Sequence, residues 1–150
     1  MLEAKEIVID EMKFQLNPLK GFKALKLDKK IVSILMPMIK GIDSLDSDID
    51  FGKAISGLAE ALESMKDDDY EKFILDLLST TIYTPAGKVP EVLGQTAIDN
   101  YFQGCATTLY QLMFEVMKYN KFTPFELVSR VGTGTLKTLI SEKLTGATES

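Results

Sequence analysis

A nearly continuous apolar pattern runs from Cys105 to Tyr119, CATTLYQLMFEVMKY. At about 100° per residue, its polar side chains share roughly 100° of a helical wheel, and the rest of the circumference is apolar. The polar residues are Thr107, Thr108, Gln111, Glu115 and Lys118. A helix at the edge of a small protein needs only one apolar stripe. This segment is therefore predicted to be the central helix, surrounded by several neighbours.

Two segments have the character of β-structure. Alternating and β-branched residues predict a short N-terminal hairpin, with strands at Lys5 to Asp10 and Met12 to Leu16 and a turn at Asp10 and Glu11. The texture changes again from Ile82 to Thr96, where a small hairpin and a packed loop both remain compatible with the sequence. Four residues in this segment forbid a helix: Pro85, Gly87, Pro90 and Gly94.

The first long amphipathic pattern predicts a helix that begins at Asn17 and Pro18, with the asparagine as N-cap and the proline at the first helical position. One face carries lysines three or four residues apart, Lys20, Lys23, Lys26 and Lys30. The opposite face collects Ala24, Leu25, Ile31, Val32 and Leu35. Pro37 lacks a backbone donor and clashes with the preceding turn, so we expect this helix to kink or stop near Met36.

Further helices are predicted on either side of the central one. An amphipathic pattern from Phe51 to Met65 is followed by a helix capped by Asp67 or Asp68. The second stripe is Tyr70, Phe73, Ile74, Leu77 and Leu78, and the short connection predicts an antiparallel pair. A helical turn is expected at Ala97 to Gly104. Thr123 to Glu126, TPFE, matches a capping box that would start a last helix, ending at about Val131.

These elements predict a mainly α fold of the α+β class. We expect a bundle of about five to six helices with a short N-terminal β-hairpin and a Pro/Gly-containing loop or small hairpin around residues 82–96. Residues 1–150 are predicted to form a single domain, because the length is typical of one. Within it we expect a hairpin at 1–17, a helical core at 18–131, and a C-terminal extension with a mobile end at 132–150.

Composition excludes several classes of function. The chain has no histidine, the commonest general base and metal ligand, and its lone cysteine, Cys105, is interpreted as small core filler. The acidic run Asp46 to Asp50 does not complete a calcium loop, because Phe51 and Gly57 occupy the positions of the required glycine and glutamate. We therefore expect no enzymatic activity, no cofactor and no metal site.

The charge of the chain limits its partners. A net charge of −5 is unsuited to binding nucleic acid, which requires a basic surface. The apolar run Ile31 to Ile39 is interrupted by Pro37 and is too short to span a bilayer, so no membrane partner is expected and the interpretation is a cytoplasmic protein. Five lysines lie between Lys20 and Lys30, and ten acids between Asp43 and Glu71. This asymmetry fits either an electrostatic guide for a charged partner or two solvated faces.

The order of these parts resembles the tail assembly chaperones of tailed bacteriophages and prophages. The resemblance covers roughly Lys5 to Phe125 and is carried by the N-terminal strand pair, NPLKGFKALKLDKKIVSIL, FGKAISGLAEALESMKDDDYEKFILDLLSTTIY and LYQLMFEVMKYNKFTPF. It implies a non-enzymatic protein that binds and solubilises the tape measure protein, helps tail tube protein assemble around it, and is absent from the mature virion. Self-association is a further partner class that the interpretation leaves open. The alternatives are a structural tail completion or connector protein and a small-ligand-binding helical domain.

Because the central helix is assigned to the core, we expect the partner surface on three other parts of the chain. These are the lysine face, the segment Ile82 to Gln95 and the C-terminal helix. The candidate partner-binding residues are Lys20, Lys23, Lys26, Lys30, Ile82, Tyr83, Val89, Val92, Leu136, Leu139 and Ile140.

Overall fold

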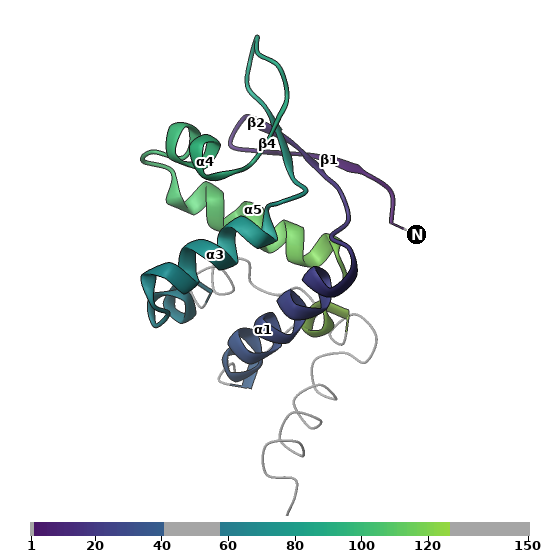
Figure 1. Ribbon diagram of the computed structural model, residues 1–150, viewed down its shortest axis with the longest axis vertical. Helices are drawn as coiled ribbons and strands as arrows, with labels where there is room; N and C mark the ends of the chain where they lie inside the picture. Colours follow the sequence, from purple (N-terminus) through teal and green to yellow (C-terminus); the bar gives the residue numbers. More distant parts are fainter. Residues whose placement is uncertain (1, 41–57, 127–150) are drawn as a thin grey trace, which may run out of the picture. The chain divides into compact units, whose positions relative to one another are not determined.

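The computed structural model describes residues 2–40 and 58–126 (Figure 1). Its contacts divide the chain into two compact units. One comprises Met1–Leu27 and Met65–Lys121, and the other comprises Asp28–Ser64 and Phe122–Ser150. The described residues are mainly helical and also form an antiparallel sheet, which confirms the predicted mainly helical α+β class.

The predicted N-terminal hairpin is confirmed. Strand β1, Lys5–Ile9, pairs antiparallel with β2, Met12–Leu16. Asp10 and Glu11 form the turn with φ of 49° and 67°. Positive φ at both central residues is what a two-residue type I′ turn requires, and its twist matches that of the flanking strands.

The Pro/Gly-containing segment is also a hairpin, formed by β3, Ile82–Thr84, and β4, Glu91–Val92. A turn precedes β4, in which the Lys88 N–H donates to the Pro85 carbonyl at 3.0 Å. Strand β3 pairs with β2, so the two hairpins form one sheet in the order β1-β2-β3-β4. The sequence pattern predicted the first hairpin and allowed the second, but it contained no signal for their pairing.

One face of this sheet is buried. Phe14 is fully buried and lies opposite Tyr83 on β3, with the ring centroids 5.2 Å apart. Residues at the end of α4, Gln95–Tyr101, complete the cluster. The Phe102 ring stacks 6.2 Å from Phe14, and the Tyr101 ring meets Tyr83 edge-on at 4.9 Å. Offset and edge-on aromatic contacts of this kind stabilise a core beyond the area they bury.

Helix α5, Ala106–Tyr119, has the central position that its apolar circumference predicts. It contacts both α3, Asp67–Leu77, and β1 (Figure 1). Seven of its residues are buried: Thr108, Leu109, Leu112, Met113, Phe114, Val116 and Met117. The assignment of Thr108 to a polar face is wrong, because this residue is 4% exposed and its hydroxyl donates to the Asp10 carboxylate.

Helix α1, Gly21–Lys40, starts later than predicted. Asn17 does not cap it. Its side-chain amide instead donates to the Thr80 carbonyl at 2.9 Å, while the Thr80 hydroxyl donates to the Asn17 carbonyl at 2.8 Å. This exchange fixes the end of β2 to the segment before β3. The helix also continues past Pro37 to Lys40 rather than stopping near Met36.

Two other helix starts differ from the prediction. Lys66, rather than Asp67 or Asp68, is the N-cap of α3, and the aspartates occupy the first turn, where negative charge favours the helix dipole. Thr123 is the first residue of the helix at 123–126 rather than its N-cap, and its hydroxyl donates to Asp28. Of the described part of the predicted Phe51 to Met65 helix, residues 58–63 are helical, with Leu58 and Leu62 buried, and the helix ends before Met65. Its earlier residues, and the predicted C-terminal elements beyond 126, lie outside the described residues.

Candidate partner-binding surfaces

The second face of the sheet is open. The strand register places Val8, Ile82 and Val92 on this face together with polar residues. Val8 is 68% exposed and Val92 is 53% exposed, while Ile82 is half-buried. The polar members are Glu6, Lys13, Gln15 and Thr84, and Lys13 pairs with Glu6 at 3.5 Å. The surface, which we call the outer sheet face, therefore combines exposed apolar side chains with a weak, solvated ion pair.

The structure separates the four candidate residues of the Ile82 to Gln95 segment. Ile82 and Val92 belong to the outer sheet face, and Val89 is 79% exposed beside it in the loop between β3 and β4. Tyr83 lies on the opposite, buried face and is 9% exposed. Val8 was not among the sequence candidates. The alternation in β1 could have identified it, because Ile7 and Ile9 point to the same face as Phe14 and leave Val8 on the other.

The lysine face of α1 carries two exposed apolar side chains, one of which, Leu25, the pattern had placed on the buried side. Lys20, Lys23 and Lys26 are exposed and Lys30 is half-buried. Between them, Phe22 is 79% exposed and Leu25 is 64% exposed. The predicted position of Leu25 on the buried side is therefore wrong. The buried stripe is Leu27, Ile31 and Leu35, spaced four residues apart, and Leu25 lies off that stripe.

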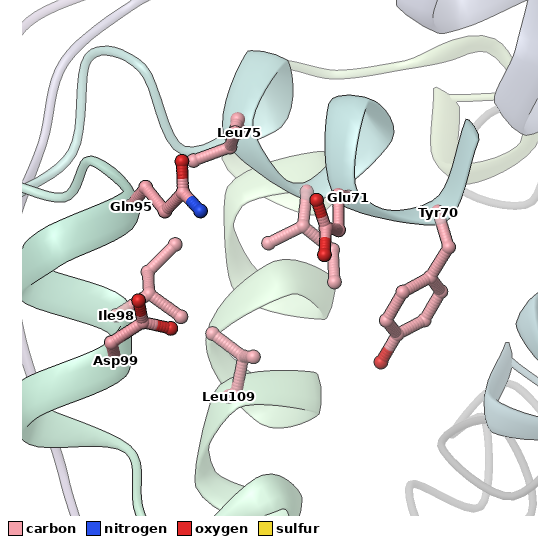
Figure 2. Close-up of a pocket in the computed structure, with 8 residues that line it drawn as sticks. Tyr70, Glu71, Leu75, Gln95, Ile98, Asp99 and Leu109 are labelled. Carbon is pink, nitrogen blue, oxygen red and sulfur yellow. The ribbon is translucent and has the colours of Figure 1, made fainter. Parts of the chain in front are cut away.

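A pocket of about 160 Å³ lies among α3, α4 and α5 (Figure 2). Its apolar lining comes from Ile74, Leu75, Ile98 and Leu109. Gln95 and two exposed acids, Glu71 and Asp99, also line it. Within the part of the chain that the structure describes, neither acid has an ion-pair partner. Lys72, next to Glu71 in sequence, pairs with Asp76 at 3.0 Å. The pocket is thus apolar inside and negative at its margin.

Tyr70 is one of the residues that line this pocket. Its hydroxyl is 2.8 Å from the Tyr110 hydroxyl, so the two phenols share a hydrogen bond between α3 and α5. Burial raises the pKa of Tyr70 above its ordinary value, and the hydrogen bond with Tyr110 raises it further. The Tyr70 phenol therefore stays neutral over the physiological pH range, and its hydrogen bond with Tyr110 links α3 to α5.

Metal-ligating side chains are not brought together in the described ranges, 2–40 and 58–126. No group of three or more cysteine, aspartate or glutamate side chains there is arranged to hold a metal ion. No helix within those ranges has the length and apolar character needed to cross a membrane. The remaining sequence candidates, Leu136, Leu139 and Ile140, lie outside these ranges.

A sheet face that combines exposed apolar and polar side chains, an apolar-basic helix face and an acidic-edged pocket are features typical of protein-binding surfaces. The phage tail assembly chaperone protein (TAC) family matches residues 10–126, more than half of the chain. The chain therefore belongs to this family, whose role in assembly indicates protein partners and a non-enzymatic function. No curated protein and no solved structure matches the chain.

Proposed function

We propose that this protein acts in the host cytoplasm as the chaperone of the tape measure protein. It binds that long helical chain, keeps it soluble, and promotes assembly of tail tube protein around it before leaving the finished particle. Membership of the tail assembly chaperone family is the observation that carries the proposal.

The outer sheet face is the surface that best suits a helical partner. A single helix buries its apolar stripe against a sheet face or a groove, and the exposed Val8 and Val92 offer such a contact without unfolding the core. Val89, in the loop between β3 and β4, is a further exposed apolar side chain. Burial of apolar area would provide the affinity, while the surrounding polar residues keep the free chaperone soluble.

Co-expression with the tape measure protein of the same phage or prophage tests the proposal. The wild type should co-purify with the tape measure protein and increase its soluble fraction. The double variant Val8→Asp, Val92→Asp places charges on the outer sheet face, so it should fold normally but lose most of this binding. The matched control is Gln103→Asp, Thr107→Asp, which adds the same charge at exposed positions elsewhere and should bind as the wild type does.

The outcomes separate the proposal from its alternative. If the wild type neither co-purifies with nor solubilises the tape measure protein, the proposed function is wrong. If both double variants bind equally well, the outer sheet face is not the binding surface. Mass spectrometry of purified particles addresses the structural alternative, since a tail completion or connector protein must be present in the virion and an assembly chaperone must be absent.

A further inference from the structure

The pocket among α3, α4 and α5 has the size and chemistry to receive a large apolar side chain. Its volume of about 160 Å³ is similar to the roughly 150 Å³ apolar cavities that accommodate benzene. Its margin carries the carboxylates of Glu71 and Asp99, and Asp67 to Asp69 add further exposed acids in the first turn of α3. An occupant is therefore expected to have an apolar anchor flanked by positive charge.

The start of α1 presents that combination. Phe22 and Leu25 are three residues apart, which places them together on one side of the helix, and both are exposed for most of their surface. Lys20, Lys23 and Lys26 surround them and are exposed as well. We call these five residues the α1 knob. The aromatic and aliphatic side chains of the knob suit the apolar lining of the pocket, and its three lysines are opposite in charge to the acids at the pocket margin.

The knob and the pocket belong to the same compact unit but lie toward opposite ends of α5. The N–H of Leu19, next to the knob, donates to the side-chain oxygen of Asn120 at 2.9 Å, just after the C-terminal end of α5. Leu109, near the N-terminal end of α5, lines the pocket. Eleven residues of helical rise separate positions 109 and 120, about 16 Å at 1.5 Å per residue. A chain therefore cannot place its own knob in its own pocket.

We propose that a second copy of this chain fills the pocket, with the α1 knob of one molecule docked among α3, α4 and α5 of the next. The inference rests on the two surfaces and is independent of the proposed function. An open assembly has one unoccupied knob at one end and one unoccupied pocket at the other, whereas a closed assembly has neither. This contact between knob and pocket is complete when two copies exchange knobs in a reciprocal two-fold dimer or when several copies close into a ring, and it continues into longer chains where it does not close.

Sedimentation velocity of the full chain over a range of concentrations tests this arrangement. The wild type should show a weight-average mass that increases with concentration to at least two copies, and the association should weaken with added salt, which screens the lysine and carboxylate charges. The knob variant Phe22→Gln, Leu25→Gln should raise the dissociation constant at least about tenfold, because it removes the apolar anchor. The pocket variant Glu71→Lys, Asp99→Lys should do the same by placing lysines opposite lysines.

Mixing the two variants gives the decisive measurement. The knob variant keeps an intact pocket, and the pocket variant keeps an intact knob. Each alone should be monomeric, whereas an equimolar mixture should form a discrete 1:1 complex that cannot grow. The charge control Glu3→Lys, Glu11→Lys alters two exposed acids away from the pocket and should associate as the wild type does. All variants are compared by circular dichroism, so that a loss of association is distinguished from a loss of fold.

Several results would overturn the proposal. These are a wild type that stays monomeric, a knob variant or pocket variant that associates as the wild type does, and an equimolar mixture that remains monomeric although both variants are folded. If the wild type is monomeric and the pocket variant loses the tape measure protein, the occupant of the pocket is that partner instead of a second copy. Failure of self-association leaves the co-purification test of the proposed function unaffected, so the two can fail separately.

Discussion

The Asp28 carboxylate holds the first residue of a helix distant in sequence, because it accepts two hydrogen bonds from Thr123. The Thr123 backbone N–H donates to Oδ1 at 2.6 Å, and its hydroxyl donates to Oδ2 at 2.7 Å. The first N–H groups of a helix have no partner within the helix itself. Asp28 therefore takes the role of a capping side chain, provided from α1 instead of from the residue preceding the helix.

We expect Asp28→Ala to lower the free energy of unfolding by about 1–2 kcal/mol, the range typical of a lost N-cap. Asp28→Asn should lose less, since its amide oxygen still accepts from the Thr123 N–H. Lys29→Ala, at the next and exposed position, is the control and should change stability little. Urea denaturation of the three variants measures these differences. Equal losses of stability for the alanine and asparagine variants would show that the hydrogen bond from the Thr123 N–H does not contribute to the free energy of unfolding.

Neighbouring threonines before β3 should respond to valine substitution with opposite signs. The Thr80 hydroxyl donates to the Asn17 carbonyl, so Thr80→Val should cost about 1 kcal/mol of stability. The Thr81 hydroxyl is buried and has no hydrogen-bond partner in the described structure. Because burying an unpaired hydroxyl is unfavourable, Thr81→Val should stabilise the protein by about 1 kcal/mol. Chemical denaturation checks both, and a destabilised Thr81→Val variant would contradict the argument.

The turn between β1 and β2 contains a site for stabilisation. Glu11 has a φ of 67°, and a side chain in this left-handed region is strained, whereas glycine is not. Glu11→Gly should therefore raise the free energy of unfolding by about 0.5–1 kcal/mol, the relief of strain less the added entropy of glycine in the unfolded chain. Thermal and urea unfolding measure the change.

Asp10→Gly is the matched control for this substitution. Asp10 also has positive φ, at 49°, but its carboxylate accepts the hydrogen bond of the buried Thr108 hydroxyl. Glycine would relieve the backbone and leave Thr108 unpaired inside the protein, so this variant should be no more stable than the wild type. If Asp10→Gly stabilised the chain as much as Glu11→Gly, the bond between the turn and α5 would be unimportant.

Local patterns predicted the elements well because each is encoded within a few turns or strand residues. The apolar circumference of α5 and the alternation of β1 and β2 are examples. Helix starts were less predictable, since the groups that satisfy their N–H donors come from elsewhere in the chain, as Asp28 does for Thr123. The pairing of β2 with β3 and the exposure of Phe22 and Leu25 likewise depend on tertiary packing between distant segments. An amphipathic pattern identifies two faces but does not say which residues at their border are covered.

Tyr70 gives the protein a defined sensitivity to alkaline pH. Burial, and then the hydrogen bond with Tyr110, raise its pKa above that of an unfolded tyrosine, which is about 10. A raised pKa means that the neutral phenol is favoured in the folded state. Its contribution to stability is therefore complete below pH about 10 and is lost as the pH rises above that value, because only the unfolded chain then releases the proton.

The expected result is a free energy of unfolding that falls from pH about 10 upward, with a smaller fall in Tyr70→Phe, which has no proton to release at this position. Tyr110→Phe should lie between the two, because it removes the hydrogen bond while Tyr70 remains buried, and burial is the larger cause of the shift. Urea denaturation at a series of pH values measures the three profiles, and tyrosinate absorbance of the folded protein follows ionisation directly. The wild type and Tyr70→Phe share all their other ionisable groups, so the difference between these two profiles is assigned to Tyr70. Coincident profiles for the wild type and Tyr70→Phe would mean that this phenol ionises as readily in the folded protein as in the unfolded chain.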